Sequence, residues 1–118
     1  MNIDEKATEL GRLIGQSAEY QAVKRANDAL NGDREAVDLL RRMEQIRRDA
    51  QRMIERGEQP TEEMERQLDE LLGKVQVSGS YQRAIAAQEN FDKVMLRVND
   101  WIMDGMKKGA TSSIITLG

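Results

Sequence analysis

Apolar side chains recur every three or four residues along most of the chain, the spacing that places them on one face of an α-helix. The clearest case is the segment from Asp33 to Gly57, which predicts a helix over residues 34–56. Its apolar positions are Ala36, Leu39, Met43, Ile46, Ala50 and Met53. The segment from Ser80 to about Lys108 keeps the same spacing. Its positions are Tyr81, Ala84, Gln88, Phe91, Met95, Val98, Ile102 and Gly105. The pattern predicts two long helices, each with one narrow face for a partner helix.

Three shorter amphipathic segments, over residues 4–16, 17–31 and 61–76, complete the pattern. Clusters of glycine, proline and serine interrupt the chain between the predicted helices, as expected for turns. A side chain that can accept a hydrogen bond from the first turn stands at the start of each helix. These predicted caps are Asp4, Ser17, Asp33, Thr61 and Ser80. The sequence therefore predicts about five helices.

The two long helices carry matching apolar faces, and the segment between them is short enough to fold back. The economical arrangement is an all-α fold, an elongated antiparallel helical hairpin within a bundle of about five helices. The predicted hairpin core is Leu39, Met43, Ile46, Met53, Phe91, Met95, Val98 and Ile102. Further apolar residues widen the face of the last helix beyond what one partner helix covers. The predicted association surface is Ile85, Val94 and Trp101.

Composition agrees with a helical class and bounds the size of the fold. The 118 residues contain one proline and only one Trp, two Tyr and one Phe, while residues that favour helices dominate. A chain of this length is about one domain, which we place at residues 1–109. Residues 110–118 are apolar and β-prone. They are predicted to form a separate tail, either frayed or docked on a partner.

The polar composition argues against catalysis. Neither histidine nor cysteine occurs, so the usual general base near neutral pH and any thiolate nucleophile or ligand are missing. We expect no enzyme activity, no cofactor and no metal site. The net charge of -3 gives no general attraction to nucleic acid or anionic lipid. Because neither a signal-like N-terminus nor a long apolar run is present, we expect a soluble cytoplasmic protein without membrane contact.

Arginines are concentrated in the predicted helix over residues 34–56, and guanidinium groups recognise phosphate. The candidate RNA contacts are Arg47, Arg48 and Arg52. The opposing interpretation is that neighbouring acids neutralise this face. Asp38, Glu44 and Asp49 each precede an arginine by three or four residues, the spacing of ion pairs along a helix. Nucleic-acid binding is therefore the alternative and not the first hypothesis.

Three stretches together carry a family resemblance. The chain reads SAEYQAVKRANDAL, then NGDREAVDLLRRMEQIRRDAQRM, then a Pro-led acidic segment and a last helix that contains AAQENFDKV. This order resembles the YlbF/YmcA (also YheA) family of small helical bacterial proteins over residues 7–106. One departure is clear. Where the family commonly has Asn-Pro before the last helix, this chain has Gly79 and Ser80.

The resemblance implies an elongated helical hairpin that dimerises and has no enzymatic activity of its own. Family members act as regulatory adaptors in competence, biofilm formation and sporulation, partly through control of an RNA-degrading endonuclease. Some of their complexes carry iron-sulfur clusters on cysteines, which this chain lacks. The first hypothesis is thus a regulatory interaction protein, a homodimer or a subunit of a hetero-complex with other regulatory proteins. The alternatives are an RNA-binding protein and a structural assembly subunit of a phage or virion.

Overall fold

Five α-helices make up the computed structural model, which describes the backbone of residues 2–117 and the side chains of residues 2–111. They are α1 (Ile3–Gly15), α2 (Ala18–Asn31), α3 (Arg34–Glu55), α4 (Glu62–Gln76) and α5 (Gly79–Leu117). No strand occurs within residues 2–117. The predicted all-α class with about five helices is confirmed, and α3 and α5 are the two long helices.

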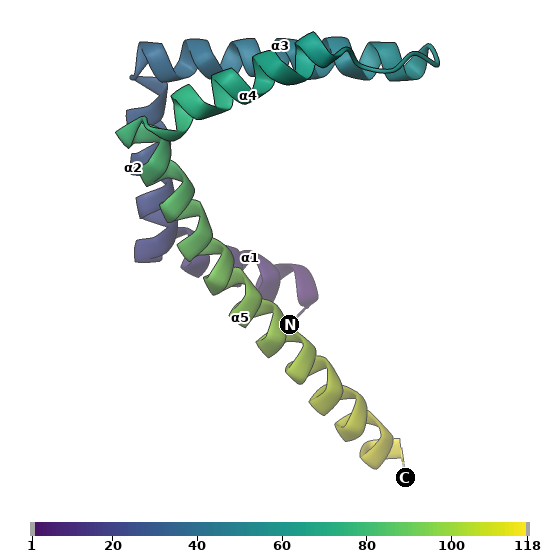
Figure 1. Ribbon diagram of the computed structural model, residues 1–118. Coiled ribbons are helices and arrows are strands. Elements are labelled where there is room, and N and C mark those ends of the chain that lie inside the picture. The colour runs from purple at the N-terminus through teal and green to yellow at the C-terminus, as the bar shows by residue number, and fades with distance from the viewer. Residues whose placement is uncertain (1, 118) are drawn as a thin grey trace.

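The helices form two arms that meet at one corner (Figure 1). In one arm α4 lies antiparallel along α3, and in the other α2 packs against α5. The radius of gyration is 21.3 Å and the extents are 66 × 38 × 19 Å. A compact chain of this length has a radius of gyration of about 13 Å. The molecule is therefore elongated.

The core of the first arm is a cluster of four buried side chains, two from each helix. Leu39 and Met43 of α3 form it with Leu71 and Val75 of α4. Val75 has no exposed surface. The partly buried residues packed against this cluster are Leu40, Ile46, Leu68, Leu72 and Tyr81. The chain reverses between the two helices at Gly57, whose φ of 80° favours glycine.

The second arm is held by the side of α5 that faces α2. The rings of Tyr20 in α2 and Phe91 in α5 meet edge to face, with centroids 5.3 Å apart. Ala84 and Val98 of α5 and Val23 of α2 are buried. Since α2 runs antiparallel to α5 (Figure 1), its first turns lie level with the middle of the longer helix.

The predicted pairing of the two long helices with each other is wrong. α3 packs against α4, and α5 packs against α2. The sequence argument paired the two longest apolar faces, although the shorter amphipathic segment over residues 61–76 also has an apolar face, which includes Leu71 and Val75. The turn at Gly57 places α4 directly against α3. The apolar face of α3 is therefore covered by α4 and is not available to α5.

The predicted hairpin core is accordingly divided between the two arms. Leu39 and Met43 are buried and Ile46 and Met53 are half-buried in the α3 arm, and Val98 is buried while Phe91 and Met95 are half-buried in the α5 arm. Ile102 is 44% exposed, so its assignment to the core is wrong. The reason is geometric, because α5 continues beyond the first residue of α2.

Three of the predicted helix caps are confirmed and two are corrected. Main-chain N–H groups donate to Ser17, Asp33 and Thr61 as expected. At the first helix the main-chain N–H of Glu5 donates to the side-chain Oδ1 of Asn2, so the cap is Asn2 and not Asp4. At the last helix the N–H of Tyr81 donates to the Ser78 hydroxyl. Ser80 is buried and its hydroxyl is engaged elsewhere.

The backbone of α5 continues to Leu117, beyond the expected end near Lys108. The helical backbone thus includes residues 110–117 of the predicted tail, while the side chains from residue 112 onward lie outside the described part. None of the described helices combines the length and the hydropathy that a bilayer span requires.

Replacing Leu71 with alanine should lower the free energy of unfolding by about 2–4 kcal/mol, because it opens a cavity in the core of the α3–α4 arm. Leu71 is 8% exposed. Leu13→Ala is the matched control, because that leucine is 60% exposed and its truncation should change stability by less than about 0.5 kcal/mol. Urea denaturation followed by circular dichroism measures both. Equal losses would contradict the assigned core.

Candidate interaction surface

Large apolar side chains are exposed along the second half of α5. Trp101, Met103 and Met106 are each more than half exposed, and Ile102 is 44% exposed. Together they lie on the part of α5 that extends past α1 and α2 toward the C-terminus (Figure 1). Isolated exposed apolar residues are ordinary, but several within two helical turns are typical of an interaction site.

The length of α2 explains this exposure. At 1.5 Å per residue α2 covers about 21 Å, whereas α5 is about 58 Å long. The side of α5 that faces α2 ends at Val98, which is the last buried residue described in that helix. Ile102, Gly105 and Gly109 follow on the same side at helical spacing. We call these three residues, with Trp101 and Met106 at their edges, the distal seam.

The two glycines make the distal seam open to close approach. A Cβ atom added at Gly105 or at Gly109 would meet nothing within 4 Å. Packing inside this chain therefore gives no reason for a glycine at either position. A helix laid against the seam could approach the α5 backbone closely at both glycines, while the flexible methionine adapts to its shape.

The predicted association surface is only partly brought together. Ile85 is 42% exposed, Val94 is half-buried and Trp101 is 67% exposed. Ile85 and Trp101 are separated by about 24 Å along the helix, so they do not form one patch. The sequence analysis missed Met103 and Met106 as surface residues. The sequence indicated these two residues, because apolar residues continue along α5 beyond the length that α2 can cover.

The arginines of α3 lie on the surface, in part neutralised by their own helix. Arg42 pairs with Asp38 at 3.0 Å, and Arg52 lies 3.9 Å from Asp49. Arg47 and Arg48 are exposed. The spacing argument is thus confirmed for Asp38 and Asp49, while no ion pair of Glu44 is seen among the described residues.

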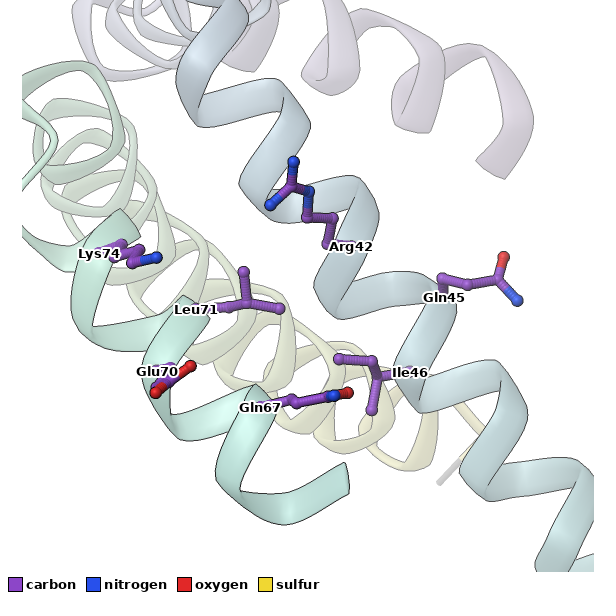
Figure 2. A pocket seen from close by; sticks show the side chains of 7 residues that line it. All are labelled: Arg42, Gln45, Ile46, Gln67, Glu70, Leu71 and Lys74. Carbon is purple, nitrogen blue, oxygen red and sulfur yellow. The ribbon is translucent and has the colours of Figure 1, made fainter. Parts of the chain in front are cut away.

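A shallow groove of about 380 Å³ lies between α3 and α4. Its lining residues are Arg42, Gln45, Ile46, Gln67, Glu70, Leu71 and Lys74. Figure 2 shows Ile46 and Leu71 pointing toward each other from the two helices, with polar side chains around them. The apolar floor is the edge of the α3–α4 core. Within the described part of the chain no cluster of acidic side chains is placed to hold a metal ion.

One carboxylate joins the two arms at the corner. Asp33 caps α3, and its Oδ2 atom accepts hydrogen bonds from the hydroxyls of Ser80 at 2.7 Å and Ser78 at 3.4 Å. Because Ser80 and then the N–H of Ala36 donate to the charged form, the pKa of Asp33 is lowered from its ordinary value. This carboxylate thus ties the start of α3 to the start of α5.

The comparisons with known proteins identify the family. The family model described as control of competence regulator ComK, YlbF/YmcA matches residues 3–107, which include α1 to α4 and most of α5. The chain belongs to this family. The resemblance stated from the sequence is therefore confirmed, and the family's description links it to the control of a competence regulator.

Similar proteins of this family occur in several bacteria. A UPF0342 protein of Limosilactobacillus reuteri (strain DSM 20016) is 28% identical over 102 residues, covering 86% of this chain and 83% of the relative. A UPF0342 protein of Bacillus mycoides (strain KBAB4) is 23% identical over 107 residues, covering 91% and 92%. Their names state no activity. No solved structure matches the chain.

Asp33→Asn should lower the melting temperature near neutral pH. It should also make the melting temperature change less as the pH falls. The folded carboxylate has the lower pKa, so it stabilises the fold above its ordinary value of 3.8. This contribution is lost as the pH falls through the folded pKa. Asparagine still caps a helix but carries no charge. Thermal unfolding between about pH 2 and pH 7 measures both chains, and parallel curves would contradict the role of Asp33.

Proposed function

We propose that the chain is a non-catalytic regulatory adaptor that binds other proteins through helical surfaces. Its partners are regulatory proteins and a second copy of the chain, in the cytoplasm, in the control of competence, biofilm formation or RNA turnover. Membership in the competence-control family supports the regulatory role. The distal seam of α5 is the observation that supports binding through a surface.

The distal seam has the composition of a binding site for a partner helix. Trp101 offers a large apolar area with one polar N–H, the kind of side chain that dominates many interfaces. Ile102 and Met106 extend the apolar area over one further turn, and Met106 is 68% exposed. An amphipathic helix of the partner would bury these side chains together.

The chemistry of the chain favours binding over catalysis. The sequence has no histidine and no cysteine. Among the described residues, Asp33 is the acid with a clearly shifted pKa. Hydrogen bonds from Ser80 and Ala36 cause that shift, and these bonds hold the fold together. The groove between α3 and α4 is open and has no buried ionisable group along it.

Affinity capture from the native cell tests the proposal. The wild-type chain should retain a defined regulatory protein, and Trp101→Asp should reduce its recovery by about tenfold or more, because a charge would lie in the apolar contact. Leu13→Asp, which changes an exposed apolar residue of α1, is the control and should leave recovery unchanged. Circular dichroism checks that both variants stay helical. Equal recovery with wild type and Trp101→Asp would contradict the distal seam as the binding surface.

The exposure of Arg47 and Arg48 favours RNA binding as the second candidate function. If the arginines of α3 bind RNA, affinity for a labelled RNA should fall steeply as salt rises. Replacing Arg47, Arg48 and Arg52 with glutamine should then weaken binding by about tenfold or more. Fluorescence anisotropy measures both effects. Binding that is unchanged in the triple variant would remove this candidate.

A further inference from the structure

The methionines that the structure describes differ widely in exposure. Met106 is 68% exposed and Met103 is 58% exposed, both in the second half of α5. Met43, in the core of the α3–α4 arm, is only 3% exposed. The half-buried methionines are Met53, Met64 and Met95. Two thioether groups that are close together on one helix are therefore open to reagents in the surrounding water.

Methionine is the residue of this chain whose sulfur an oxidant can reach, because the sequence has seven methionines and no cysteine. Hydrogen peroxide transfers one oxygen atom to a thioether sulfur. The O–O bond breaks, the sulfur gives up two electrons to the peroxide, and water is released. The product is methionine sulfoxide, a polar side chain in place of an apolar one. Methionine sulfoxide reductases remove the oxygen again, so the change is reversible.

The two exposed methionines lie at different distances from the distal seam. At about 100° per residue, Met106 lies about 60° around the helix from the middle of the seam, whereas Met103 lies about 120° from it. Met106 also follows Ile102 by four residues, the spacing of neighbours on a helix surface. A partner helix on the distal seam would therefore cover Met106 and leave Met103 outside the contact.

We infer that Met106 is an oxidation site that controls binding at the distal seam. In the reduced form its thioether adds apolar area and adapts to the shape of the partner helix. In the sulfoxide form a strong hydrogen-bond acceptor lies in the same contact, and burying that acceptor among apolar groups removes its water and lowers the affinity. This inference rests on the proposed function and adds a hydroperoxide as the signal that regulates the site.

Binding should also protect the site from the oxidant. In the free chain the Met106 side chain is exposed, whereas a partner helix on the distal seam would cover its sulfur. A bound partner should therefore slow the oxidation of Met106 and leave the oxidation of Met103 unchanged. The two methionines thus report separately on the seam and on the neighbouring surface of the same helix.

Limited oxidation of the full chain with hydrogen peroxide tests the reactivity first. Mass spectrometry of peptides taken at increasing times gives a separate rate for each methionine. Met106 and Met103 should oxidise at least about tenfold faster than Met43, because the reagent reaches a buried sulfur only after local opening. Circular dichroism checks that the chain stays folded. Equal rates for Met106 and Met43 in the folded chain would overturn the inference, whatever the binding experiments show.

Affinity capture with the oxidised chain then tests the effect on binding. Peroxide treatment, followed by removal of the peroxide, should reduce recovery of the regulatory protein by about tenfold, and a methionine sulfoxide reductase should restore it. Met106→Leu keeps an apolar side chain of similar volume, so its recovery should survive the treatment. Met103→Leu is the matched control on the same helix, and its recovery should fall as that of the wild type does. Met106→Gln, which is polar, should bind weakly before any treatment.

Two outcomes of the capture would overturn the inference. One is unchanged recovery when Met106 is fully oxidised, and the other is loss of recovery by oxidised Met106→Leu, which would assign the effect to a different residue. If Trp101→Asp abolishes recovery while oxidation does not, the proposed function stands and this inference alone fails. A reduced wild-type chain that recovers no protein would reject both.

Discussion

The burial of one apolar face of α3 against α4 determines the rest of the architecture. Leu39 and Met43 are enclosed by Leu71 and Val75, and the turn at Gly57 makes this contact local in the sequence. Since α3 is thereby occupied, α5 packs against α2. A helix of 39 residues then has a partner of only 14. The unequal lengths leave the large apolar side chains described after Val98 in α5 exposed.

The proposed contact follows from this mismatch. The side of α5 that faces α2 continues into the distal seam, where Trp101, Ile102 and Met106 are exposed next to two glycines. The last helix thus offers, beyond the reach of its partner in the same chain, an apolar surface suited to a helix of another protein.

Much of the fold could be predicted because it depends on neighbouring residues. The helix ends at Ser17, Asp33 and Thr61 follow from local hydrogen bonds, and the core positions Leu39 and Met43 follow from their spacing. The partner of each face could not be predicted in this way. The contact of Asp33 with Ser80 joins residues 47 positions apart, and it moved the cap of α5 to Ser78. Ile102 has core spacing, but its exposure depends on where α2 begins.

The sequence by itself determined the helices, the side of each helix that is apolar, and the order of charges along α5, because these properties repeat within a few residues of the chain. The tertiary structure decided which apolar sides meet and where each contact ends. Several helix faces have similar apolar composition, so composition alone does not decide which two of them pack together. The geometry of the turns and the lengths of the helices decide it. For this reason Trp101 was identifiable as an anchor from its residue type, whereas the distal seam became visible only once α2 was seen to stop short of it.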